Sequence, residues 1–308
     1  MSTKALLLLD PATLIPKSLL ICCLAIVSVV GAPPLGAQTA AEAFGAGRAA
    51  VLAGDYDNAI PQLERAVELN ESNADYHYWL GRAVYEAAPR ASKLRMPGMA
   101  RRVRNEWERA VTLDGNQVDA RAGLAEWYAM APGFMGGDKA KAREQASEIA
   151  KRNPMRGAMA RGVIASHEDN WPAEVEAYQQ AIVFAPDTAA AYVALADEYA
   201  RTNRIDSAFV TIARYASRRP TDPWRLYYFG RFAGSTGQRL EEGEQALRQF
   251  LGAPPPALTA AGLSRARYWL GKIAERRGNR QLAGEQYQSA LQANPANYTA
   301  KQALEALK

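Results

Sequence analysis

The apolar and polar residues of this chain follow one helical register that recurs along most of its length. Four stretches place small and large apolar residues at matching positions with polar residues between them: GDYDNAIPQLERAVELNES from Gly54, DNWPAEVEAYQQAIVFAPD from Asp169, NRIDSAFVTIARYASRRPTD from Asn203 and GNRQLAGEQYQSALQANPAN from Gly278. Runs of alternating Val, Ile and Thr, which strands require, are few. The pattern therefore predicts an all-α protein built from repeated helical units.

The spacing of the repeats points to a known family. Pro186 and Pro220 are 34 residues apart. In the last stretch, Leu270-Gly271 is followed by a small residue, an aromatic residue, a second small residue and a proline: Ala283, Tyr287, Ala290 and Pro295. This order resembles the tetratricopeptide family, whose period is 34 residues. The resemblance implies a right-handed superhelical solenoid of about seven helix-turn-helix repeats, followed by a C-terminal capping helix.

We expect the repeats at about 40–73, 74–117, 118–154, 155–188, 189–222, 223–263 and 264–297, and the cap at 298–308. No repeat can bury its apolar faces alone, so the last one needs a cover. The closing segment YTAKQALEALK suits this role, because Tyr298, Ala303, Leu304 and Leu307 can share one face of a helix.

The second predicted repeat exceeds the family period by about ten residues, around PRASKLRMPGMARRVR. This basic insertion contains six cations and no acid before Glu106; the cations are Arg90, Lys93, Arg95, Arg101, Arg102 and Arg104. One interpretation is a solvated loop leading into an elongated second helix. The other is contact with an anionic surface, such as lipid headgroups or an acidic partner, because clustered cations raise the local potential.

The third predicted repeat carries a shorter insertion, APGFMGGDK. Its glycines give the backbone freedom to turn, and Asp138 can cap the next helix. We expect Phe134 or Met135 to pack against a neighbour. A phosphate-binding loop is not expected, because the Asp138 carboxylate would repel phosphate and the Gly-Lys-Ser/Thr ending is missing.

The first 37 residues read as an export signal. Lys4 and Lys17 precede the apolar run from Ser18 to Val30, which is followed by GAPPLGAQTA. The run is too short to span a bilayer comfortably, so we expect residues 1–37 to be a signal peptide cleaved after Ala37 and the mature chain to have no transmembrane span. The alternative is an uncleaved N-terminal anchor. The predicted location is periplasmic or secreted, with membrane association if the signal is retained.

Charge and chemistry-bearing residues narrow the function further. The net charge of +5 is not gathered into long Lys/Arg blocks, so nucleic acid is not an expected partner. Both cysteines lie in the predicted signal. His77 and His167 are nearly three repeats apart and cannot share a metal ion. The acidic residues are expected on solvent-exposed faces, and no catalytic motif is present. We therefore predict no catalytic residue, no metal and no cofactor, and a protein that is not an enzyme.

The working surface implied by the resemblance is the concave groove, lined by the first helix of each repeat. Its register selects these candidate partner-binding residues: Tyr78, Arg82, Arg156, His167, Trp224, Tyr227, Arg231, Tyr268, Lys272 and Arg276. The same register also includes Phe44, Arg48, Asp119, Glu126, Met159, Val163, Asp197, Arg201 and Arg265. Tyr, Trp and Arg are common at binding hot spots, and such a groove suits a peptide with acidic groups. The alternative is that these aromatic residues pack between helices.

These observations favour a non-catalytic scaffold or adaptor of the bacterial cell envelope that binds a peptide or protein segment in the concave groove. Two alternatives stay open. One is an accessory subunit or enzyme that acts on envelope polymers. The other is self-assembly through stacked solenoid ends, against which the charged capping helix argues.

Overall fold

The computed structural model describes residues 38–307, and within them every regular element is a helix. The predicted signal peptide and its cleavage site lie outside the described residues. The α-helices are α1 (Ala40–Ala53), α2 (Tyr56–Leu69), α3 (Ala74–Ala87), α4 (Met96–Leu113), α5 (Val118–Met130), α6 (Lys139–Arg152), α7 (Pro154–His167), α8 (Trp171–Phe184), α9 (Ala189–Arg201), α10 (Ile205–Arg218), α11 (Trp224–Thr236), α12 (Leu240–Gly252), α13 (Ala260–Arg276), α14 (Arg280–Ala293) and α15 (Tyr298–Ala306). Two short 3-10 helices, η2 (Ala88–Arg90) and η3 (Gly133–Met135), lie in the two insertions.

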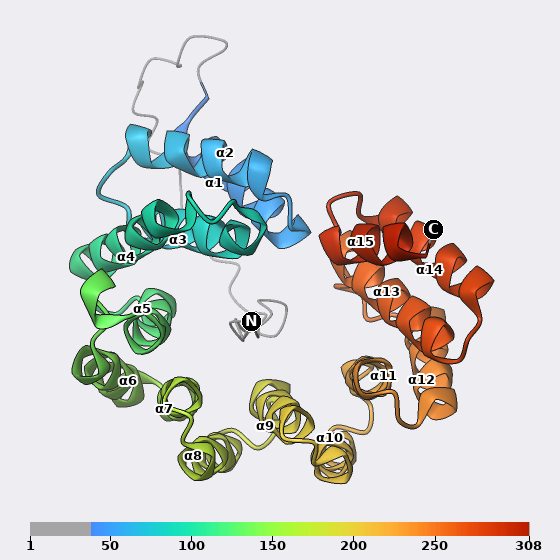
Figure 1. Cartoon of the computed structure of the whole chain (residues 1–308). Helices are drawn as coiled ribbons and strands as arrows, with labels where there is room; N and C mark the ends of the chain where they lie inside the picture. Colours follow the sequence, from blue (N-terminus) through green and yellow to red (C-terminus); the bar gives the residue numbers. More distant parts are fainter. Residues whose placement is uncertain (1–37, 308) are drawn as a thin grey trace, which may run out of the picture.

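The helices form seven consecutive pairs, α1/α2 to α13/α14, and α15 packs on the last pair (Figure 1). The prediction of an all-α repeat solenoid is therefore confirmed. Helix α13 begins at Ala260, four residues before the expected start of the last repeat at 264. The reason is local: the Thr259 side chain accepts a hydrogen bond from the backbone N–H of Gly262 and starts the helix early.

Close contact within a pair depends on glycine in the first helix. A Cβ atom added to Gly162 would lie 2.4 Å from the Tyr178 ring, and one added to Gly271 would lie 2.3 Å from the Tyr287 ring. Each aromatic ring therefore occupies the space that a side chain would need. This is the physical basis of the Leu-Gly and aromatic positions in the recurring register.

Polar caps start several of the second helices at equivalent positions. Asp55, Asn170 and Asn279 each accept a hydrogen bond from a backbone N–H three residues later. Such side chains satisfy amide groups that have no partner within the helix. In the third pair Asp138 caps α6, as the sequence predicts, by accepting from the N–H groups of Ala140 and Lys141.

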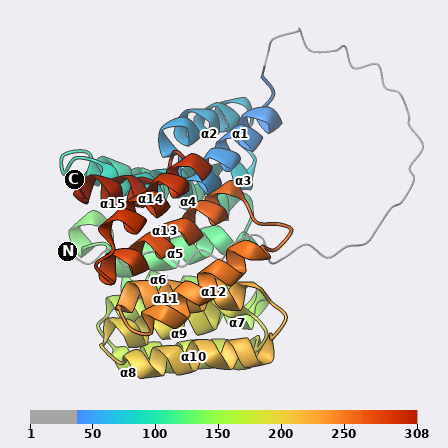
Figure 2. The same cartoon turned by 90° about the vertical axis from the view of Figure 1, so that its right-hand side faces the viewer.

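The solenoid curves through nearly a full circle, with the odd-numbered helices α1 to α13 on the inside and the even-numbered helices outside (Figures 1 and 2). Its two ends touch. Asn294 Nδ2 donates a hydrogen bond of 2.6 Å to the carbonyl oxygen of Ala53, and the Arg90 guanidinium lies 4.7 Å from the ring centroids of both Tyr56 and Tyr298. We call these five residues the seam.

The capping helix takes part in this closure. Ala303, Leu304 and Leu307 pack against the core of the last pair, as the sequence predicts. Tyr298 is partly exposed instead and stacks on Arg90, so it serves the seam. The side chain that was expected to cover the last repeat thus contacts the other end of the ring.

Candidate partner-binding surface

The candidate groove residues lie on helices of the inner side of the ring (Figure 1). Tyr78 and Arg82 belong to α3, Arg156 and His167 to α7, Trp224, Tyr227 and Arg231 to α11, and Tyr268, Lys272 and Arg276 to α13. They differ in exposure and in partners, and they sort into three groups.

The first group consists of aromatic side chains that pack between helices. Tyr78 and Tyr227 are buried, and loss of water raises the pKa of Tyr78 to about 12. Trp224 packs with its ring centroid 5.4 Å from that of Tyr227 and 5.3 Å from that of Phe250. Most of the surface of these three side chains is therefore in contact with neighbouring helices. Tyr268 is half-buried, as Trp224 is, and its ring centroid lies 5.8 Å from that of Tyr287.

The second group consists of charges that are paired between neighbouring repeats. Arg231 donates to both carboxylate oxygens of Asp197, at 2.7 and 2.8 Å, and Arg156 forms an ion pair with Asp119. Each pair joins the inner helices of consecutive repeats. Because each cation already has a carboxylate, these pairs add no net positive charge to the inner face.

A buried acidic cluster was not predicted, and the expectation that acidic residues lie on solvent-exposed faces is wrong for Glu126, Glu174 and Glu198. The side chain of Glu126 accepts a 2.9 Å hydrogen bond from Tyr85 Oη. The nearest atom of His167, Nε2, lies 3.9 Å from the same carboxylate. His167 therefore belongs to this internal polar cluster and not to an open groove.

Glu174 and Glu198 face each other between α8 and α9, with 2% and 5% of their surfaces exposed. Burial and then the interaction with the neighbouring Glu198 carboxyl raise the pKa of Glu174 to about 8. Arg201 forms an ion pair with Glu198 and lies 3.6 Å from Glu174. The sequence contained a signal for this site, because Glu174 occupies the small-residue position that Ala208 and Ala283 hold in later repeats.

The third group consists of cations without a carboxylate at ion-pair distance. Arg48 and Arg82 lie over the Trp79 ring, at 5.2 and 4.8 Å from its centroid, and Arg276 donates to the carbonyl oxygen of Ser235 at 2.8 Å. None of these three arginines has an ion-pair partner within residues 38–307. They come from the first, second and seventh repeats.

Ring closure places the first and last pairs of helices side by side. Helices α1 and α13 touch across the seam. Tyr56 on α2 lies near cations of the second and the seventh repeat. Burial raises the pKa of Tyr56 to about 12, and the positive charges of Arg82 and Arg265 oppose that rise. We call Arg48, Arg82, Tyr268, Lys272 and Arg276 the seam arc. Of these, Lys272 also bonds to Glu275 on its own helix at 3.0 Å.

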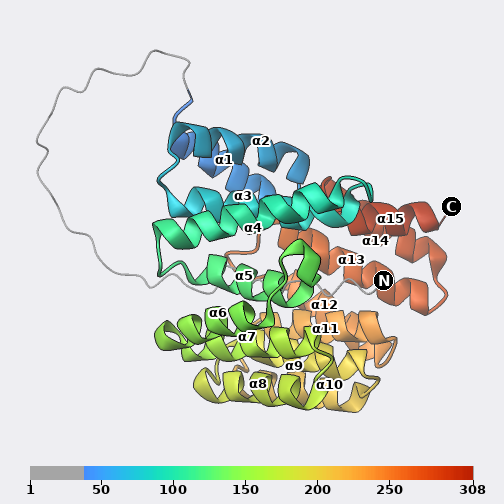
Figure 3. The same cartoon turned by 60° about the vertical axis from the view of Figure 1, so that its left-hand side comes forward.

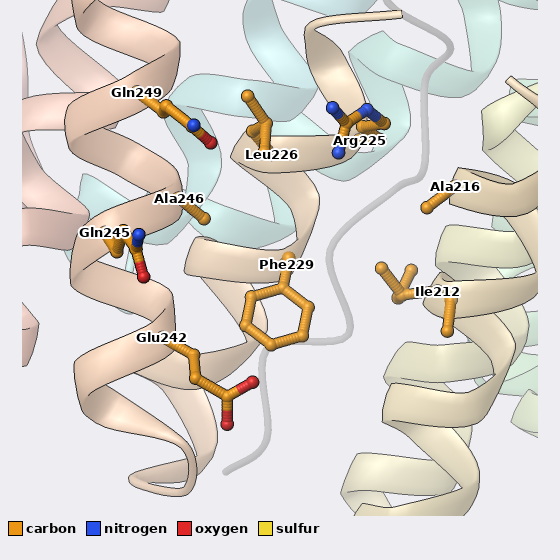
Figure 4. A pocket seen from close by; sticks show the side chains of 10 residues that line it. Ile212, Ala216, Arg225, Leu226, Phe229, Glu242, Gln245, Ala246 and Gln249 are labelled. Atoms are coloured by element: carbon orange, nitrogen blue, oxygen red, sulfur yellow. The ribbon is translucent and has the colours of Figure 1, made fainter. Parts of the chain in front are cut away.

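A separate groove opens on the outer side between α10 and α12, with α11 as its floor (Figure 4). Its volume is about 310 Å³, and it is lined by Ile212, Ala213, Ala216, Arg225, Leu226, Phe229, Glu242, Gln245, Ala246 and Gln249. None of the predicted site residues lines it. It therefore has no part in the inner surface.

The basic insertion divides into loop and helix. Arg90 ends η2, Lys93 and Arg95 lie in the following turn, and Arg101, Arg102 and Arg104 lie on α4, which has 18 residues. The interpretation of a loop leading into an elongated second helix matches this arrangement.

Metal binding finds no support in the described part of the chain. Residues 38–307 contain no group of three or more His, Cys, Asp or Glu side chains arranged to hold a metal ion. His77 is bonded within the protein, with Nδ1 2.7 Å from a Glu106 carboxylate oxygen and Nε2 3.0 Å from the carbonyl oxygen of Glu71.

Comparison with known proteins gives matches to two repeat models and to solved helical solenoids. The family models "TPR repeat" and "Tetratricopeptide repeat" match residues 47–87 and 264–297. No curated protein matches the chain. Yeast Tom70 is 13% identical with a TM-score of 0.61, and the match covers 89% of this chain and 57% of that one.

Two further solved structures are similar to the chain. A monomeric mutant of IFIT1 solved with Gppp-AAAA is 14% identical with a TM-score of 0.51, over 87% of this chain and 62% of that one. A tetratricopeptide repeat protein from Parabacteroides merdae is 14% identical with a TM-score of 0.48, over 88% and 99%. At these identities the likeness concerns the fold alone. From the two matched repeats and the seven helix pairs, we identify the chain as a tetratricopeptide-repeat protein.

Proposed function

We propose that this protein is a non-catalytic adaptor of the bacterial cell envelope that binds an acidic segment of a protein partner at the seam arc. The observation that carries the proposal is the closure of the ring. It places α1, which bears Arg48, against α13, which bears Tyr268 and Arg276. The proposal is that cations far apart in the sequence act there on one partner.

The chemistry of the seam arc favours carboxylates presented on a peptide. Charge-assisted hydrogen bonds from Arg to a carboxylate are about twice as strong as neutral ones. Tyr268 is half-buried on α13 and supplies apolar contact area, as hot-spot aromatics do, whereas Trp79, over which Arg48 and Arg82 lie, is buried. A segment with several acids and an apolar residue would satisfy both kinds of contact.

Nucleic acid fits the inner face less well, although the IFIT1 structure was solved with Gppp-AAAA. Asp119 and Asp197 on the inner helices of the third and fifth repeats already neutralise Arg156 and Arg231, so a phosphate backbone that continued around the ring would meet paired charges there. A short acidic segment confined to the seam arc avoids them.

An enzyme acting on envelope polymers would need a carboxyl pair that is open to the groove. The pair of Glu174 and Glu198 is the nearest approach to such a site, yet both residues are almost completely buried between α8 and α9. We therefore propose a structural role for the pair and no catalytic one for the protein.

We also propose that the protein is exported to the periplasm or secreted, because the order of the first 37 residues is typical of a signal peptide. None of the helices between residues 38 and 307 combines the length and the apolarity that crossing a bilayer would require. Contact of the basic insertion with a membrane surface belongs to the same proposal.

The test is a titration of the protein with a fluorescent oligo-glutamate peptide. The variant Arg48→Gln/Arg82→Gln/Arg276→Gln, here the arc variant, should bind on the order of tenfold more weakly or worse, because exposed charge pairs contribute a few tenths to 1 kcal/mol each. The matched control, Lys93→Gln/Arg95→Gln/Arg101→Gln, here the rim variant, removes the same charge elsewhere. Equal weakening in both variants would reduce the effect to net charge and reject the proposed site.

A further inference from the structure

The two insertions of the chain lie along one edge of the ring (Figure 3). Trp127 Nε1 in the third repeat donates a 3.0 Å hydrogen bond to the carbonyl oxygen of Ala100 on α4. The Arg104 guanidinium on α4 lies 5.3 Å from the centroid of the Trp127 ring, and a Cβ atom added to Gly136 would lie 2.5 Å from Arg104 Nη1. The α5–α6 loop therefore packs against the first turns of α4, which follow directly on the α3–α4 loop, and we call the two loops together the rim (residues 92–101 and 130–139).

The rim presents apolar side chains to solvent. Leu94 is 94% exposed and Phe134 is 91% exposed, one at the tip of each loop. Of the two residues of which one was expected to pack against a neighbour, η3 turns Phe134 outward, while Met135 is half-buried. Met96 and Met130 are also exposed. Single exposed apolar residues are ordinary, but four along one edge of the ring indicate an interaction surface.

Cations without partners surround these apolar tips. Lys93, Arg95 and Arg101 are exposed and have no ion-pair partner in the described part of the chain. The other members of the basic insertion are engaged. Arg102 pairs with Glu64 at 2.6 Å, and Arg104 lies 3.8 Å from Glu108.

The loop is held at its base and free at its tip. Arg90 lies between Tyr56 and Tyr298 and donates to the carbonyl oxygen of Gly54 at 3.1 Å, which ties the start of the loop to the seam. In the second loop, the acidic Asp138 is occupied in capping α6. The charge that the rim offers to a partner is therefore positive.

We infer that the rim docks on an anionic membrane, with Leu94 and Phe134 entering the boundary between headgroups and acyl chains and with Lys93, Arg95 and Arg101 on the headgroup phosphates. A lipid surface accepts protruding apolar tips and cations at the same time. An acidic protein would satisfy the cations, but it would leave the tips in water unless it carried two matching pockets. The contact deepens the envelope role proposed above and rests on it only for the compartment.

The geometry leaves the seam arc available while the rim is docked. The rim belongs to the loops at the edge of the ring, whereas the seam arc lies on the inner faces of α1, α3 and α13 (Figures 1 and 3). One molecule can therefore contact a membrane and a protein segment together. The two contacts are also separable by mutation.

The experiment uses the full chain with Cys22→Ser and Cys23→Ser. Single substitutions Leu94→Cys, Phe134→Cys or Val183→Cys carry a bimane fluorophore; Val183 is 77% exposed on α8, away from the rim, and serves as the control position. The protein is titrated with vesicles of phosphatidylglycerol and phosphatidylcholine in equal parts, or of phosphatidylcholine alone, that contain a nitroxide-labelled lipid as quencher.

The inference predicts quenching at positions 94 and 134 with the anionic vesicles, and none at 183. The rim variant should raise the lipid concentration for half-maximal quenching on the order of a hundredfold, because each basic residue near an anionic surface contributes about a factor of five. The arc variant should leave it unchanged. All labels lie in exposed loops or on an outer face, so circular dichroism should report the same helix content throughout.

Three results would overturn the inference: no more quenching at 94 and 134 than at 183, equal quenching with neutral vesicles, or an unchanged lipid requirement in the rim variant. Protection of the label at 94 from aqueous iodide by oligo-glutamate, without lipid quenching, would assign the rim to an acidic protein instead. None of these results bears on peptide binding by the arc variant, so the two proposals fail separately.

Discussion

Asn294, just after α14, donates a 2.6 Å hydrogen bond to the carbonyl oxygen of Ala53 at the end of α1, across 241 positions of sequence. This contact makes an open solenoid into a nearly closed ring (Figure 1). It also brings the inner helices of the first and last repeats, α1 and α13, into contact, on which the proposed function depends. The predictions below follow from this closure and from the packing that supports it.

Loss of the seam contacts should open the ring. The double variant Asn294→Ala/Arg90→Ala removes the hydrogen bond and the stacking on Tyr56 and Tyr298, and one neutral hydrogen bond contributes about 1 kcal/mol. Pulsed electron paramagnetic resonance between spin labels at positions 57 and 292 should give a longer and broader distance distribution. Asn105→Ala, on the outer α4, is the control. Identical distributions in all three proteins would show that the seam does not hold the ends together.

Close packing within a helix pair predicts opposite effects for two glycine substitutions. Gly162→Ala would force a Cβ atom to 2.4 Å from the Tyr178 ring, so stability should fall by about 1 to 3 kcal/mol. Gly45→Ala lies inside α1 with nothing within 4 Å and should be neutral or stabilising, because alanine favours the helix. Urea unfolding measures both. A fall of the same size at both positions would contradict the packing argument.

The buried carboxyl pair predicts a pH dependence of stability. The pKa of Glu174 is raised above its ordinary value of 4.5, so the folded protein binds a proton that the unfolded chain releases. The associated stability is fully present below the ordinary pKa and is lost as pH rises through the raised one. Glu174→Gln keeps a donor toward Glu198 without a titrating group.

We therefore expect Glu174→Gln to flatten the curve of unfolding free energy against pH and to stabilise the protein at the alkaline end, by on the order of 1 kcal/mol. Urea unfolding across the pH range measures this. Glu176→Gln, an exposed change on the same helix, should run parallel to the unchanged protein. If both variants run parallel to it, Glu174 does not hold the extra proton.

The Arg231–Asp197 pair should stabilise the solenoid and have little part in binding. Its side chains are 21% and 37% exposed, between a surface pair and a buried one, so Arg231→Gln should cost about 1 to 2 kcal/mol of stability. A double-mutant cycle with Asp197→Asn isolates the pair energy. The affinity for oligo-glutamate should change less than twofold. A loss of affinity as large as in the arc variant would show that Arg231 takes part in binding.

The helix pairs were predictable from the sequence because their main contacts lie within one repeat. Gly162 packs on Tyr178 in this way, and Gly271 packs on Tyr287. Closure was not predictable in the same way. The contact of Asn294 with Ala53 depends on the sum of small rotations between repeats, which no single repeat encodes. Family register also placed Tyr78 in the groove, although the structure buries it between helices.

The acidic cluster was missed for a different reason. Charge patterning treats an acid on a helix as a surface residue, yet Glu174 stands at a small-residue core position, where burial is enforced by the neighbouring helices. At Glu174 residue type conflicts with position in the repeat, and position decides burial.

The central claim is that a protein partner binds at the seam arc inside the ring, and photocrosslinking in living cells tests it most directly. A photoreactive phenylalanine analogue replaces Tyr268 on the inner α13 or, as the control, Val210, which is exposed on the outer α10. We predict a crosslinked partner from position 268 that is lost in the arc variant and kept in the rim variant. A partner captured equally from position 210, or one from 268 that persists in the arc variant, would contradict the account.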